Sequence, residues 1–113
     1  MDININLLET SIEQYNDMVP PKLPIFTGED IITEVSFLTA NQYAKKSRHP
    51  ETEKIFMILK GSGVIIIEDK HYDISSGSTI FVDKGQWHQI LNGKKGKMTV
   101  YQITKSKFTT EYQ

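Results

Sequence analysis

Two histidines, His49 and His88, are the side chains of this sequence with the clearest capacity for chemistry. An imidazole can ligate a divalent metal, accept a proton near neutral pH or hydrogen-bond an anion. The chain has no cysteine, which excludes disulfides, thiolate metal ligands and a cysteine nucleophile. Because the two histidines lie far apart in the sequence, a shared site requires a fold that brings two separate segments together.

The segment around His88 carries a spaced set of turn and site residues. In GSTIFVDKGQWHQILN these are Gly77, Asp83, Gly85, His88 and Asn92. Their spacing resembles the second sequence motif of the cupin superfamily, with Asp83 standing where proline is usual. Aspartate is also a favoured turn residue, so the turn remains allowed. The resemblance predicts that Gly85 turns the chain and aims His88 into a β-barrel.

A second segment, SRHPETEKIFMILKG, resembles the first cupin motif when Gly61 sets the register. His49 then matches the second histidine of that motif. Ser47 falls at the first histidine, and Lys54 falls at the glutamate. The two motifs together identify the chain as similar to small single-domain cupins.

The resemblance implies an all-β fold, a double-stranded β-helix (jelly-roll) barrel with a short N-terminal extension. One domain is predicted over residues 1–113, with its core at about 31–104. The turn signals independently favour an antiparallel barrel or sandwich, because short β-rich runs alternate with Gly, Asn and Asp corners. The predicted strands are Ile31–Thr39, Ile55–Leu59, Val64–Ile67, Tyr72–Ile74, Thr79–Val82, Trp87–Leu91 and Met98–Ile103.

A typical cupin holds its metal with three histidines and a glutamate, and this sequence keeps only His49 and His88 of that set. An inward Lys54 ammonium would repel a cation by about 4 kcal/mol per unit charge at ~4 Å and an effective dielectric of 20. If a β-bulge turned Glu53 inward instead, His49, His88 and Glu53 would form a two-histidine, one-carboxylate site. Such a site would suit a divalent transition metal, namely Fe, Mn, Ni or Zn.

The same departures favour a binding site for a small, anionic molecule, lined by Ser47, His49, Lys54 and His88. This binding function, with its reaction unknown, is the first hypothesis. A metal-dependent oxygenase or isomerase using His49 and His88 is the first alternative. A metal-free enzyme similar in logic to sugar epimerases is the second, with a histidine as base and a tyrosine such as Tyr101 as acid. Whether the chain is an enzyme stays open.

The run Ile55–Leu59 is apolar at every position. An antiparallel strand with one face in water should alternate apolar and polar residues, so both faces of this strand are expected to be covered. Two coverings stay open: the N-terminal segment of the same chain, and a homodimer interface, in which that segment could be exchanged between subunits.

The bulk composition of the 113 residues argues against two partner classes. Thirteen basic side chains oppose fourteen acidic ones, for a net charge of −1. A near-neutral chain lacks the charge that attracts nucleic acid or anionic membrane, so neither is an expected partner. Met1–Tyr15 has no basic region of the kind that opens a signal peptide, and the longest apolar run is too short for a bilayer. A cytoplasmic protein is therefore predicted.

Overall fold

The computed structural model describes residues 22–39, 43, 46–93 and 96–105. These residues form β-strands and no helix, and so contain no helix that could cross a membrane. The sequence pattern also predicts a short N-terminal strand (Ile3, Ile5, Leu7) and a weakly helical segment over Glu9–Met18, and both lie outside the described residues. The strands are β1 (Lys22–Thr27), β2 (Ile31–Leu38), β3 (Glu53–Lys60), β4 (Ser62–Ile67), β5 (Lys70–Ser75), β6 (Thr79–Val82), β7 (His88–Asn92) and β8 (Met98–Lys105).

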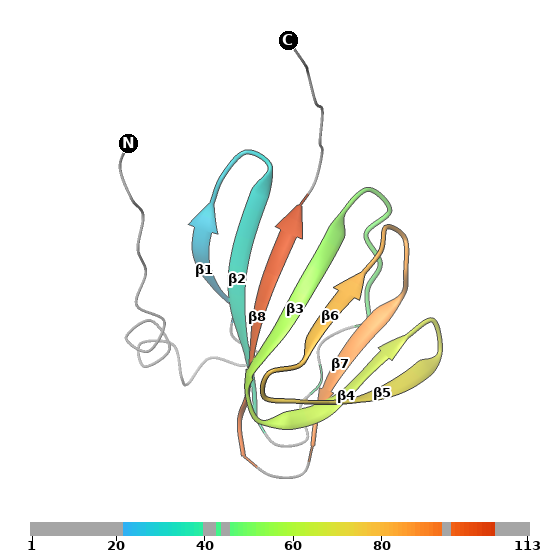
Figure 1. Ribbon diagram of the computed structural model, residues 1–113. Helices are drawn as coiled ribbons and strands as arrows, with labels where there is room; N and C mark the ends of the chain where they lie inside the picture. Colours follow the sequence, from blue (N-terminus) through green and yellow to red (C-terminus); the bar gives the residue numbers. More distant parts are fainter. Residues whose placement is uncertain (1–21, 40–42, 44–45, 94–95, 106–113) are drawn as a thin grey trace.

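The strands form two antiparallel sheets (Figure 1). The larger sheet has the order β1-β2-β8-β3-β6, and the smaller sheet has the order β5-β4-β7. Strands far apart in the sequence are neighbours, since β8 pairs with both β2 and β3. This arrangement confirms the predicted all-β jelly-roll architecture.

Strand β1 is missing from the strands predicted above, which begin at Ile31, because the prolines Pro20, Pro21 and Pro24 predict an extended passage and no helix here. Pro24 lacks an N–H group and is tolerated because β1 lies at the edge of its sheet. The pairing register of β1 with β2 shifts between Pro24 and Phe26. The larger sheet therefore begins before Ile31.

Two turns show how local backbone geometry serves the barrel. The β4–β5 hairpin turns at Glu68 and Asp69, whose φ angles are 48° and 67°. Positive φ at both positions is the geometry of a type I′ turn, which matches the twist of the flanking strands. Gly85 has a φ of 76°, which confirms the predicted reversal of the chain before His88.

The hydrophobic core lies between the two sheets and draws on both. A second, smaller cluster packs on the outer face of the larger sheet and contains Leu23, Val35 and Phe37. The core between the sheets contains Leu38, Phe56, Ile58, Ile65, Ile74, Val82, Ile90, Met98 and Val100.

Asn92 ties three parts of the chain together at the end of β7. Its Nδ2 donates to the carbonyl oxygen of Leu38 at 2.7 Å and to that of Gly96 at 3.0 Å. The sequence predicted a hairpin role for Asn92, and the structure shows a buried cross-link between β2, β7 and the loop that leads to β8.

The substitution Asn92→Ala is expected to lower the free energy of unfolding by about 2–3 kcal/mol, because it leaves the buried Leu38 carbonyl without its donor. Urea denaturation followed by circular dichroism measures the change. Lys70→Ala, at an exposed position of β5, is the control and should change stability by less than about 0.5 kcal/mol. Equal effects of the two substitutions would contradict the cross-link.

Candidate functional site

Hydrogen bonds between main-chain groups hold the segment that carries His49 against the start of β7. The amide of Ser47 donates to the carbonyl of His88, and the amide of His88 donates to the carbonyl of Ser47, both at 3.0 Å. The amide of Gly85 donates to the carbonyl of His49 at 2.9 Å. The two sequence motifs are therefore joined directly, and the histidines meet.

The Trp87 ring contacts two cations of the segment that carries His49. The Arg48 guanidinium lies 4.9 Å and the Lys46 ammonium 5.7 Å from the centroid of the indole ring. Cation–π contacts of this kind stabilise exposed pairs modestly. The amide of Trp87 also donates to the Glu68 carboxylate at 3.0 Å. The apolar, β-compatible sequence around Trp87 predicts a side chain in the core or a pocket wall. The prediction of a core position was wrong, because 40% of Trp87 is exposed.

Lys54 lies on the inner face of β3. In the sheet, Lys54 lies opposite Val82 of β6 and Thr104 of β8. Its chain neighbours Glu53 and Ile55 lie on the other face of the strand, because successive side chains of a strand point to opposite faces. Only 7% of Lys54 is exposed. Its ammonium donates to Nε2 of His49 at 2.9 Å.

The hydrogen bonds assign the same tautomer to both imidazoles. Nδ1 of His88 donates to the carbonyl of Gln86 at 3.1 Å, so its Nε2 carries the lone pair. The Ser47 hydroxyl lies 3.5 Å from that Nε2, at the long limit of a hydrogen bond. Nε2 of His49 accepts from Lys54 and is also unprotonated. The ring centroids of the two histidines are 5.9 Å apart.

Burial lowers the pKa of Lys54, His49 and His88 at this centre. The pKa of Lys54 falls from 10.5 to about 8, first because of burial and then because of the nearby Lys22 charge, while the Glu34 carboxylate raises it. The pKa of His49 is lowered by burial, then by Lys54. The pKa of His88 is also lowered chiefly by burial, although its hydrogen bond to Gln86 opposes the change. The lowered pKa values favour the neutral form of both imidazoles at pH 7.

These residues do not fit a divalent metal site of the usual cupin kind. The lone pair of His49 that would bind the metal already accepts from the Lys54 ammonium. The register of β3 is regular from Glu53 to Ile58, so no bulge turns Glu53 to the face that holds Lys54. Among the described residues, no three His, Asp or Glu side chains group as metal ligands.

The structure brings together Ser47, His49, Lys54 and His88, but not Tyr101. Tyr101 pairs with Met57 and Val35 and packs against the outer cluster of the larger sheet. Side chains alternate along β8, so its neighbour Gln102 faces inward instead.

Sequence reasoning missed Lys22 and Glu34, whose charges act on Lys54 in the part of the chain that the structure describes. Both lie on strands of the larger sheet, and no motif marked them. The alternation of side chains along β2 is the signal that could have placed Glu34, once the pairing of β2 with β8 is known. Glu34 lies opposite Gln102, whose side chain faces inward.

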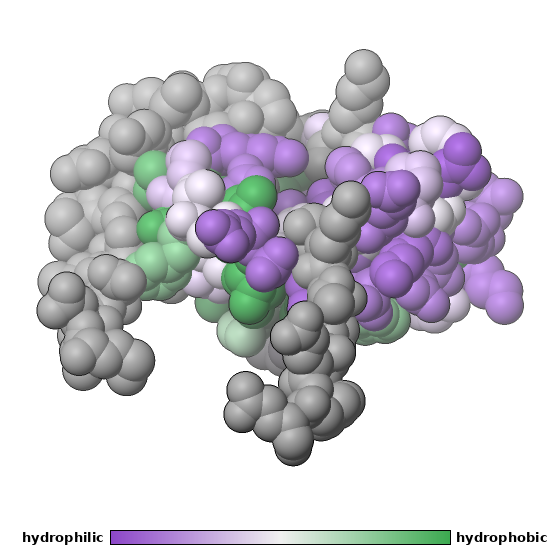
Figure 2. Space-filling model, turned by 90° about the horizontal axis from the view of Figure 1, so that it is seen from above, coloured by the Kyte–Doolittle hydropathy of each residue, from purple (hydrophilic) through white to green (hydrophobic). Residues whose placement is uncertain are grey.

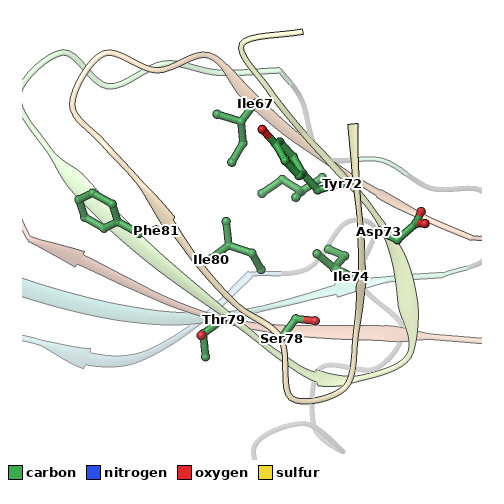
Figure 3. Close-up of a pocket in the computed structure, with 9 residues that line it drawn as sticks. Ile67, Tyr72, Asp73, Ile74, Ser78, Thr79, Ile80 and Phe81 are labelled. Atoms are coloured by element: carbon green, nitrogen blue, oxygen red, sulfur yellow. The ribbon is translucent and has the colours of Figure 1, made fainter. Parts of the chain in front are cut away.

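Two open grooves among the described residues lie away from His49 and Lys54. One, with a volume of about 420 Å³, opens beside β4, β5 and β6, where Ile67, Tyr72 and Ile80 line it (Figure 3). The other, of about 340 Å³, includes Val64 and His71. Both are lined largely by apolar side chains. Seen from above, the right-hand side of the molecule is largely hydrophilic (Figure 2).

A two-sheet antiparallel barrel that joins a histidine before β3 to a histidine at the start of β7 defines the cupin class of protein. The family model described as "Cupin domain" matches residues 36–104, and the chain belongs to this family. A search of curated proteins finds no match.

Solved structures give the same fold at low sequence identity. The chain is similar to the TT1209 protein of Thermus thermophilus, with 21% identity, 92% of this chain and 98% of that chain covered, and a TM-score of 0.84. It is also similar to a "predicted oxalate decarboxylase" of Thermotoga maritima, with 20% identity, 76% and 79% coverage, and a TM-score of 0.73. KdgF from Halomonas sp. is 9% identical, with 76% and 78% coverage and a TM-score of 0.68. At these identities the likeness establishes the fold alone.

Replacing Lys54 by methionine is expected to stabilise the protein at pH 7 by up to about 3 kcal/mol, because the variant buries no ammonium. The folded protein binds the Lys54 proton more weakly than the unfolded chain does. Between pH 8 and 10.5, the free energy of unfolding of the wild type therefore rises toward that of Lys54→Met. Urea titrations of both proteins across this range should show the difference shrinking, and a difference independent of pH would contradict it.

The same variant should raise the pKa of His49 and of His88, because it removes a positive charge that lowers both. NMR titration of the imidazole protons measures the two midpoints, which lie below 6.5 in the wild type. Unchanged midpoints would show that the ammonium is not close to the rings.

Proposed function

We propose that this cupin binds a small anionic molecule at the site formed by Ser47, His49, Lys54 and His88. The observation that carries the proposal is the buried Lys54 ammonium, whose hydrogen bond goes to a neutral imidazole. Among the described residues, no carboxylate forms an ion pair with Lys54. A buried charge without a counter-ion is costly, and an anionic ligand would supply that counter-ion.

The neighbouring groups favour an anion over a cation. Lys22 adds a second positive charge that acts on Lys54 and on both histidines, whereas Glu34 is the one carboxylate among the described residues that acts on Lys54. Ser47 and the neutral imidazoles add hydrogen-bonding groups beside the ammonium. A carboxylate or phosphate oxygen bound to Lys54 would form a charge-assisted hydrogen bond, which is among the stronger kinds.

Binding can be measured with Trp87, the only tryptophan of the chain, which directly precedes His88. Lactate, succinate and glycerol 3-phosphate are titrated while its fluorescence and the melting temperature are followed. At least one of them should give a saturable fluorescence change and a higher melting temperature. Lys54→Gln should weaken that binding about ten- to a hundredfold, as expected for loss of a charged hydrogen bond.

The matched control is Lys60→Gln, which removes an exposed lysine from the other end of β3. It should leave binding within about twofold of the wild type. If no anion binds, or if both variants weaken binding equally, the proposed function is wrong.

We also propose that the outer face of β3 and β6 pairs with a second copy of the chain. Ile55, Met57 and Phe81 are 41%, 37% and 54% exposed, and Ile55 lies directly opposite Phe81 in the sheet. The expectation that both faces of β3 are covered is thus not met within the described residues. The apolar strip continues across the same face into the cluster around Val35, and a two-fold axis would bury the exposed part against its own copy.

Sedimentation equilibrium of the wild type should give a dimer, and Ile55→Glu should give a folded monomer, because a buried glutamate would stand unpaired at the two-fold contact. Tyr72→Glu, which places the same charge at an exposed position of β5, should remain a dimer. A monomeric wild type would overturn the dimer.

A further inference from the structure

The arrangement of Lys54 and His49 offers more than a binding contact. The Lys54 nitrogen lies 2.9 Å from Nε2 of His49, a lone pair that can accept one of its protons. Lys54 lies on β3, which is hydrogen-bonded to β8 on one side and to β6 on the other, so the backbone that carries the amine is rigid. A primary amine beside a neutral imidazole, on a rigid element and shielded from bulk water, is the arrangement that makes lysine a nucleophile.

We infer that Lys54 forms a Schiff base with a small 2-oxo acid, and that His49 exchanges the protons of this step. The inference rests on the proposed anion site, because the carboxylate of the acid is what would hold the carbonyl carbon beside Lys54. Lys22 is the residue that would bind this carboxylate, because its positive charge acts on Lys54 and on both histidines.

The step balances without an oxidant or reductant. The Lys54 ammonium first gives a proton to Nε2 of His49. The freed electron pair of the nitrogen then forms a bond to the carbonyl carbon. The carbonyl oxygen takes a second proton from the same nitrogen and becomes a hydroxyl. The nitrogen then forms a C=N bond as the hydroxyl leaves, and His49 returns its proton so that the hydroxyl departs as water. The net change is ammonium plus carbonyl to protonated imine plus water.

The state of the Lys54 amine supports this chemistry. With a pKa of about 8, the amine is unprotonated in an appreciable fraction of molecules near neutral pH. A lysine at its ordinary pKa of about 10.4 has roughly a hundredfold less free amine under the same conditions. Lys54 should therefore react first among the lysines of the chain.

The test is reductive trapping. The full chain is incubated at about pH 7.5 with pyruvate or with glyoxylate in the presence of sodium cyanoborohydride, and the modified lysine is found by peptide mass spectrometry. Lys54 should carry the reduced adduct at a rate about ten- to a hundredfold above that of the exposed Lys60 and Lys70. Lactate, which has the carboxylate but no carbonyl, should slow the labelling by competition.

Two variants separate the roles. Lys54→Arg keeps a positive charge that cannot form an imine, so it should retain anion binding by fluorescence while losing the fast labelling. His49→Gln should label Lys54 more slowly, with a changed pH profile, because the proton acceptor is gone. Labelling spread evenly over the surface lysines would overturn the Schiff base. Anion binding with no trapping would overturn the Schiff base and leave the proposed function standing, whereas no binding of lactate, succinate or glycerol 3-phosphate would overturn the proposed function itself.

Discussion

The alternation of side chains along β3 from Glu53 to Ile58 is the constraint on which the rest of this structure depends. The strand is hydrogen-bonded to β8 on one side and to β6 on the other, so neither edge can slip. This pairing sends Phe56 and Ile58 into the core and Ile55 and Met57 to the outer face. The same parity buries Lys54, whose charge then dominates the candidate site.

The site combines that rigid strand with a segment held by main-chain hydrogen bonds. Ser47 and His88 exchange two hydrogen bonds, which fixes the position of His49 beside Lys54. The result is a cupin in which an ammonium group binds the imidazole lone pair that a metal would otherwise use. A fixed cation of this kind attracts oxygen anions but contributes no open coordination positions, and this difference separates the proposed chemistry from that of metal-dependent relatives.

Much of the fold was predictable because turn chemistry is local. The strand over Thr79–Val82 was predicted at its observed bounds, since Gly77 and Asp83 mark its two ends. The β1 strand was missed because Pro24 argues against a strand unless its edge position is known. Trp87 was misplaced because its indole is largely apolar, whereas the fold leaves it exposed beside two cations of another segment, Lys46 and Arg48.

The sequence by itself determined the cupin family, through the spacing of Gly77, Gly85, His88 and Asn92, and it marked His49 and Lys54 as residues of one site. Only the tertiary structure decided which neighbour on β3 faces inward. Glu53 and Lys54 are adjacent, so a single bulge would exchange them, and no local signal reports a bulge. The pairing of β3 with both neighbouring strands leaves its start regular, and this long-range constraint gives the site a buried cation instead of a carboxylate.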